Sequence, residues 1–158
     1  MSTALLMCLW MQEGAGKPVV KDGLSITVVP VKATVGAGES PVLEWTLKNV
    51  SAKDVVVNVP SRWTADWQTF SLKDVKGRSW SSGLHIPGDP IETPRTLKPG
   101  ESLSHQATLT AFFPDDPKQA GQEQRHLATG KYTATVTLKF TSGWTGPIVS
   151  NPVEVEVK

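Results

Sequence analysis

The sequence predicts an all-β protein, an immunoglobulin-like antiparallel β-sandwich of about 7–9 strands. Two observations favour this class: the apolar runs alternate with polar residues, and 13 glycines and 12 prolines separate them as turn residues. A third observation is that no segment of roughly ten or more residues spaces its apolar side chains at the helical period.

The first half of the chain contains five of the expected strands. In the second of them, Leu43, Trp45 and Leu47 fall on one face and polar residues fall on the other, as in a half-buried strand. The turn residues at 49–54 and the prolines Pro30 and Pro60 end neighbouring runs. These strands are expected at residues 24–30, 43–47, 55–59, 70–72 and 78–81.

The second half contains three longer expected strands, at residues 103–113, 132–140 and 148–157. The sequence Leu-Lys-Pro-Gly at 97–100 forms the turn before the first of them. Two stretches are expected to be irregular. One combines residues 61–68 with 80–95, and the other is the polar segment 114–129, whose length is typical of functional or disordered loops.

The length and net charge of the chain indicate which classes of binding partner are expected. A chain of 158 residues suits one domain, and a net charge of +1 produces no overall field that would attract nucleic acid or an anionic membrane. No apolar run is long enough to span a bilayer, so no integral membrane span is expected. The single cysteine, Cys8, excludes an intrachain disulfide. A protein or carbohydrate partner remains possible on these grounds.

The N-terminus differs from the rest of the chain. The apolar run ALLMCLWM at 4–11 is followed by small and polar residues, which is typical of a signal peptide and its cleavage region. We expect residues 1–17 to be a leader or a disordered terminus, residues 18–158 to be the domain, and the location to be extracytoplasmic, either periplasmic or secreted. The alternatives are lipidation at Cys8, a start codon assigned too far downstream, and an ordinary buried strand.

Four motifs in this order resemble a known family: LEWTLKNVSAKDVVV (43–57), FSLKDVKGRSW (70–80), LKPGES (97–102) and TGKYTATV (129–136). They are similar to bacterial extracytoplasmic immunoglobulin-like modules of the BsuPI type, the intracellular proteinase-inhibitor domain. The resemblance implies a sandwich with a binding or inhibitory role and gives no inhibitory residue to carry over. Within such a fold, Trp45 is expected to be the core indole. Tyr132 is expected to form a tyrosine corner with an upstream backbone group.

Metal, cofactor and nucleophile motifs are absent from the sequence. His85, His105 and His126 lie far apart, and the acids Asp89, Asp115 and Asp116 do not form a calcium-loop pattern. The sequence has no G-x-S-x-G elbow, and VGAGES (35–40) is followed by a strand pattern rather than by a phosphate-binding helix. We therefore expect no enzyme and no cofactor. A cleft shared by His105 and a carboxylate would be the feature that favours catalysis.

The tryptophans are the strongest candidates for a binding surface. Trp63 and Trp67 lie in an irregular segment beside Arg62 and Asp66, and Trp80 follows soon after. Aromatic faces with polar neighbours can stack on a sugar or grip a side chain of a partner. The alternative is that these indoles fill one end of the sandwich.

The sequence thus indicates a non-catalytic extracytoplasmic binding module, with a BsuPI-like protease inhibitor as the alternative. An inhibitor needs a stiff protruding loop, whereas segment 114–129 is rich in Gln, Lys and Gly and poor in apolar anchors. Asn49-Val50-Ser51 is formally a glycosylation sequon, but it lies in an expected turn and is assigned no function.

Overall fold

The computed structural model describes residues 17–64, 66–82, 91–116, 118, 123–140 and 143–158. Within these ranges the chain forms thirteen strands and no α-helix, which confirms the all-β class. The predicted leader lies outside the described residues except for Lys17. No helix in the described part is long and apolar enough to cross a membrane.

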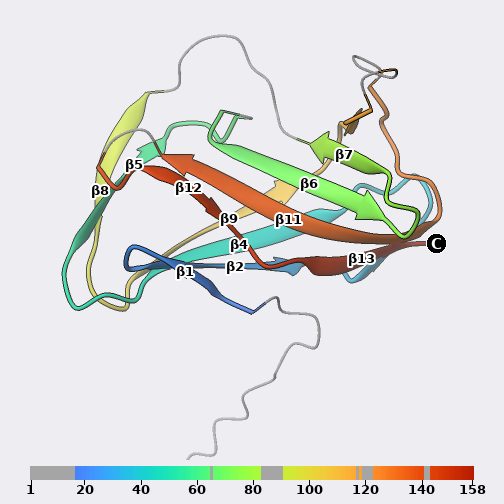
Figure 1. Ribbon diagram of the computed structural model, residues 1–158. Helices are drawn as coiled ribbons and strands as arrows, with labels where there is room; N and C mark the ends of the chain where they lie inside the picture. The colour runs from blue at the N-terminus through green and yellow to red at the C-terminus, as the bar shows by residue number, and fades with distance from the viewer. Residues whose placement is uncertain (1–16, 65, 83–90, 117, 119–122, 141–142) are drawn as a thin grey trace, which may run out of the picture.

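The strands form two main layers and a small separate sheet (Figure 1). A four-stranded sheet has the order β1-β2-β4-β9, and a seven-stranded sheet has the order β10-β7-β6-β11-β13-β3 with β12 paired to β11. The antiparallel pair of β5 and β8, which are not consecutive in the chain, forms a two-stranded sheet at the end of the molecule opposite the C-terminus. The bounds are β1 Val19–Lys21, β2 Leu24–Pro30, β3 Thr34–Val35, β4 Val42–Asn49, β5 Val55–Pro60, β6 Gln68–Asp74, β7 Ser79–Ser82, β8 Glu92–Leu97, β9 Ser102–Thr108, β10 Phe113–Pro114, β11 Gly130–Phe140, β12 Gly146–Val149 and β13 Val153–Val157.

The core lies between the two layers and is built from the alternating residues of the sequence pattern. Leu43, Trp45 and Leu47 on β4 are fully buried, and so are Leu24, Ile26 and Val28 on β2. On β11, the even-numbered residues from Tyr132 to Phe140 are buried, whereas the threonines and lysines between them face outward. A one-residue shift would expose every one of these side chains, so the apolar pattern fixes the register.

Tyr132 forms the expected tyrosine corner. Its hydroxyl donates a hydrogen bond of 2.7 Å to the backbone oxygen of Ala128, four residues upstream. The phenol ring is buried and packs edge-on against Trp80, with ring centroids 5.8 Å apart. This contact anchors the start of β11 to the loop that precedes it.

Two expected strands are each divided in the structure. The run at 103–113 forms β9 in the four-stranded sheet and β10 in the seven-stranded sheet, so the chain changes layer between Leu109 and Phe112. The run at 148–157 breaks at Ser150, whose hydroxyl accepts a hydrogen bond of 3.0 Å from the backbone N–H of Val136. β1, β3 and β8, which were not expected as strands, account for the rest of the difference between thirteen strands and the expected 7–9.

The stretch 80–95 was expected to be irregular, and this prediction is wrong at both ends, since residues 80–82 belong to β7. Residues from Glu92 to Arg95 belong to β8, which pairs antiparallel with β5. Every side chain of β8 except Leu97 is exposed, so the strand has no apolar face that a sequence pattern would reveal.

Asn49 organises the turn after β4. Its side-chain nitrogen donates to the backbone oxygens of Lys53 (2.8 Å) and Leu97 (2.7 Å), and its oxygen accepts from the N–H and hydroxyl of Ser51 (2.9 and 2.8 Å). The residue has 0% exposure, so the sequon offers no accessible amide for a glycan in the folded protein.

Candidate functional site

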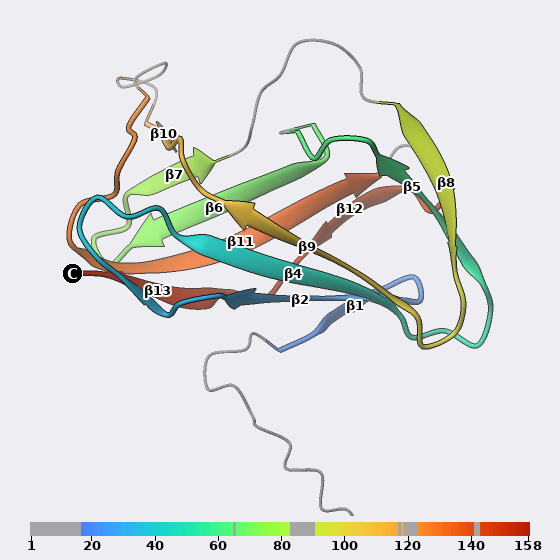
Figure 2. The ribbon, with the colours of Figure 1, turned by 180° about the vertical axis from the view of Figure 1, so that it is seen from behind.

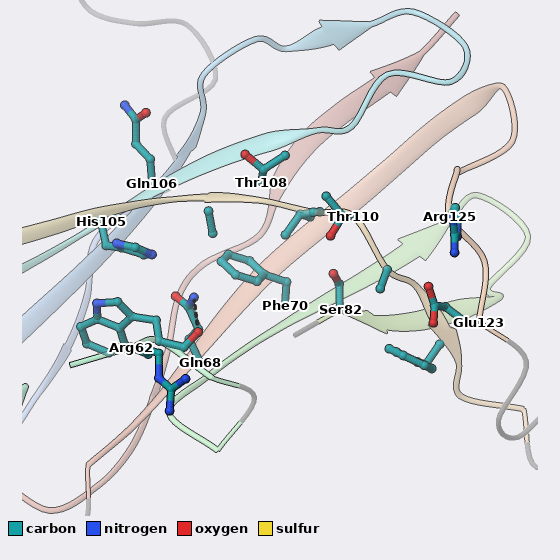
Figure 3. A pocket seen from close by; sticks show the side chains of 15 residues that line it. Arg62, Gln68, Phe70, Ser82, His105, Gln106, Thr108, Thr110, Glu123 and Arg125 are labelled. Carbon is teal, nitrogen blue, oxygen red and sulfur yellow. Dashed lines mark hydrogen bonds between the residues drawn. The ribbon is translucent and has the colours of Figure 1, made fainter. Parts of the chain in front are cut away.

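The candidate site is a half-open pocket of about 800 Å³ between the edges of the two main layers. The four-stranded sheet ends at β9, whereas the seven-stranded sheet continues past β6 with β7 and β10 (Figure 2). Part of the inner face of the larger sheet is therefore left uncovered. The pocket is lined by side chains from β6, β7 and β9 and from the segments around residues 62–63, 109–113 and 123–125 (Figure 3).

The floor of the pocket is mostly apolar. Phe70 and Leu109 have only 1% and 2% exposure, and Ala107 of β9 packs beside them. Ser82 is also buried, and its hydroxyl points into the space beside Phe70 (Figure 3). Within the described residues this hydroxyl has no hydrogen-bond partner, so it is available to a ligand.

One end of the pocket is aromatic. The imidazole of His105 lies 5.8 Å from the Trp45 ring and 5.7 Å from the Trp63 ring, and the two indoles meet edge-to-face at 4.8 Å. Gln68 holds this cluster in place: its carbonyl oxygen accepts from Trp45 Nε1 at 3.0 Å, and its amide nitrogen donates to the Trp63 backbone oxygen at 3.4 Å.

Burial lowers the pKa of His105 below its ordinary value near 6.5. The imidazole is therefore neutral at neutral pH, with one nitrogen that donates a hydrogen bond and one that accepts. The uncharged imidazole ring of His105 therefore lines the pocket as a polar group.

The charged residues of the pocket lie at its rim. Arg62 is exposed near His105, whereas Glu123 and Arg125 are exposed at the opposite end (Figure 3). Glu123 and Arg125 flank Gln124, which exchanges two backbone hydrogen bonds of 2.8 Å with Phe112. That pairing brings part of the polar segment 114–129 to the pocket.

The lowered pKa of His105 predicts a pH dependence of stability. Because the unfolded chain binds a proton more readily than the folded protein, this contribution is full above about pH 6.5 and is lost as the pH falls below it. The Tm of the wild type should therefore drop more between about pH 7.5 and about pH 5 than that of His105→Gln. Thermal melts at the two pH values measure the difference, and equal drops in both proteins would contradict it.

The structure separates the five predicted site residues. Arg62 and Trp63 line the pocket, and Trp63 is half-buried. Asp66 is exposed and does not line it. Trp67 and Trp80 are only 5% and 6% exposed, so they do not share an exposed aromatic patch with Trp63.

The indoles of Trp67 and Trp80 are instead packed inside the sandwich, as the alternative to a binding surface predicts. Trp67 packs edge-on against Phe140 at 6.3 Å, and Trp80 packs against Tyr132 and lies under the Arg78 guanidinium at 5.5 Å. Apart from Arg62 and Trp63, none of the lining residues was assigned to the site from the sequence; they include Phe70, Ser82, His105, Ala107, Glu123 and Arg125.

Two of the acidic residues considered for calcium, Asp115 and Asp116, have other contacts, and the third, Asp89, lies outside the described residues. Asp115 accepts a hydrogen bond of 2.9 Å from the Ser81 hydroxyl, and Asp116 accepts one of 2.9 Å from the backbone N–H of Lys118. In the part of the chain that the structure describes, no group of three His, Cys, Asp or Glu residues is placed to hold a metal ion.

No protein-family model matches the chain, and no curated protein matches it. Among solved structures, a β-glucosidase from Listeria innocua in complex with isofagomine is similar at a TM-score of 0.38 and 18% identity, over 85% of this chain and 16% of that one. The C-terminal domain of wzt is similar at 0.44 and 10%, over 90% and 78%. An ApaA protein from Bordetella pertussis is similar at 0.42 and 14%, over 85% and 93%.

The chain thus spans a small part of the glucosidase and most of the other two proteins. Similarities with TM-scores below 0.5 indicate nothing about ligand or activity. No family model supports the resemblance to the BsuPI-type family. The structure shows only that the chain is an all-β sandwich.

Proposed function

We propose that the chain is a non-catalytic binding module whose binding surface is the pocket between β9 and the β6–β7 hairpin. The observation that supports this most is the pocket itself, where an apolar floor and the Ser82 hydroxyl, which has no hydrogen-bond partner among the described residues, share one cavity of about 800 Å³. Ligand sites in proteins commonly have volumes of roughly 300–1,000 Å³, with mostly apolar walls and a few polar groups that fix orientation.

The surroundings of His105 support binding rather than acid–base catalysis. The ring is held by contacts with Trp45 and Trp63, while the carboxylate of the pocket, on Glu123, lies at the other end (Figure 3). A catalytic pair needs hydrogen-bond reach between its members. Both groups thus line one cleft, as the enzyme alternative requires, without forming a pair.

Filling the pocket tests the proposal. Ala107→Trp places an indole in the cavity from the inner face of β9, and Ser104→Trp places one on the outer face of the same strand as the matched control. In a fragment-library screen by ligand-detected NMR, hits on the wild type should be retained by Ser104→Trp and weakened about tenfold or more by Ala107→Trp, equivalent to ~1.4 kcal/mol.

Thermal melts accompany the screen, and Ala111→Trp at the pocket rim is a second filling variant in case Ala107→Trp is overpacked. Hits that bind both filling variants as well as the wild type would show that the ligand surface lies elsewhere.

Two finer predictions stay predictions. The extracytoplasmic location depends on the apolar run at 4–11, which lies outside the described residues. The inhibitor alternative needs a stiff protruding loop, and segment 114–129 is described only in part.

A further inference from the structure

The free edge of β9 borders the pocket. Among the described residues, β9 pairs with β4 on one side and with no strand on the other. Two backbone hydrogen bonds next to the strand, from Asn49 N to the Glu101 oxygen and from Leu109 N to the Pro41 oxygen, show which residues of β9 are hydrogen-bonded to β4. Odd-numbered residues of β9 therefore bond to β4, and the N–H and C=O groups of Ser104 and Gln106 point toward the free edge.

This edge lacks the features that usually prevent strand pairing. It runs for seven residues from Ser102 to Thr108 and contains neither proline nor a charged residue. The other edges are short or interrupted: β1 has three residues, β3 and β10 have two each, and β8 and β12 contain Pro94 and Pro147. β5 ends at Pro60 and is bridged on its other side by backbone contacts with Gly143 and Trp144. β9 is thus the exception among the edge strands that the structure describes.

The four-stranded sheet also ends before the sheet that it covers. β7 and β10 extend past β9 in the second layer (Figure 2), and Ser82 of β7 belongs to the uncovered face. A further strand beside β9 would lie over this face. Since alternate side chains of a strand point to opposite sides, every second side chain of the added strand would enter the pocket.

We propose that an extended segment of a partner protein adds to β9 as a fifth strand of this sheet. Main-chain hydrogen bonds to Ser104 and Gln106 would supply affinity, and the pocket would select the side chains. An apolar side chain suits the floor at Phe70, and a carboxylate suits the end near Arg62. The inference rests on the proposed function and names the partner of the same site.

A second copy of this chain fits the edge less well. Two β9 strands would pair antiparallel about a two-fold axis perpendicular to the sheet. The overhanging β7 and β10 of each copy would then extend into the second layer of the other copy. A single extended segment has no second layer and avoids this collision.

The test uses the full-length protein and a displayed library of random peptides about nine residues long, which is the length of a long strand. Gln106→Pro removes an N–H that points away from β4 and places a ring on the free edge. Gln106→Thr keeps that N–H and is the matched control, because both variants lose the 2.6 Å hydrogen bond from Gln106 to Glu44.

We expect selected peptides to carry large apolar residues at alternate positions. They should bind the wild type and Gln106→Thr equally and bind Gln106→Pro about tenfold or more weakly, provided that the two variants melt at the same temperature. N-methylation of a selected peptide should abolish binding at alternate residues and be tolerated at those between them.

Other outcomes overturn the inference. Peptides insensitive to Gln106→Pro, or a library that yields no binder, would exclude strand addition at β9. A dimer of the wild type that Gln106→Pro dissociates in analytical ultracentrifugation would assign the edge to a second copy. If fragments bind in a manner sensitive to Ala107→Trp while no peptide depends on the β9 edge, the binding pocket stands and the peptide partner fails.

Discussion

Replacing Trp45 with alanine is expected to destabilise the protein by about 3–5 kcal/mol, a large share of the stability of a single domain. Trp45 has 0% exposure and packs against Trp63 and His105. Its removal leaves a large cavity and also leaves the side-chain oxygen of Gln68 without its donor. Urea denaturation followed by circular dichroism measures the loss.

Two control variants separate the causes. Glu44→Ala changes the outer face of the same strand and should cost no more than about 0.5 kcal/mol. Trp45→Phe retains much of the buried volume and loses the bond to Gln68, so its cost should lie between those of the two alanine variants. Similar losses at Glu44 and Trp45 would contradict the inward position of the indole.

Replacing Asn49 with alanine is expected to cost about 2–4 kcal/mol, although the side chain is small. All four hydrogen-bonding positions of its amide are used, and the Leu97 oxygen would lose its side-chain donor in a buried site. Asn49→Asp should cost more, because it would set a carboxylate oxygen against the carbonyl oxygens of Lys53 and Leu97. Thermal and urea unfolding measure both effects.

The matched control for Asn49 is Ser51→Ala, which loses hydroxyl contacts at the exposed side of the same turn. Its cost should be about 1 kcal/mol or less. If Ser51→Ala and Asn49→Ala destabilise the protein equally, the turn depends on its local hydrogen bonds rather than on the link between Asn49 and Leu97.

The fold was predictable where one face of a strand is buried and the other is solvated. β4 and β11 show this alternation over their whole length, so both their existence and their inward residues follow from the sequence. β8 was not predictable, because its exposed side chains give no period and only its backbone pairing with β5 defines it. The change of layer near Leu109 was not predictable for a different reason. Because the strands of both layers direct apolar residues inward, the apolar pattern continues unbroken where the chain passes from one layer to the other.

The site was predictable only in part. Arg62 and Trp63 were named because an indole in a polar, irregular segment is conspicuous. Trp80 is buried on β7 rather than exposed, and Ser82 shares its face, but a strand that reads Ser-Trp-Ser-Ser has no alternation that would mark the inward serine. Arg125 reaches the pocket only because Gln124 pairs with Phe112, and no local signal in the sequence indicates that contact.

The separate two-stranded sheet of β5 and β8 has a consequence for hydrogen exchange. Among the described residues it shares no ladder with either main sheet. It is attached through the buried side chains of Val57 and Leu97, through the hydrogen bond from Asn49 to the Leu97 oxygen, and through backbone contacts of Val57 with Gly143 and of Val56 with Trp144. Few contacts must break for it to open, so its amides can exchange by a sub-global opening that leaves β4 and β11 closed. This end of the sandwich thus forms a cooperative unit of lower stability than the layers that enclose the core, and its β8 amides exchange before theirs.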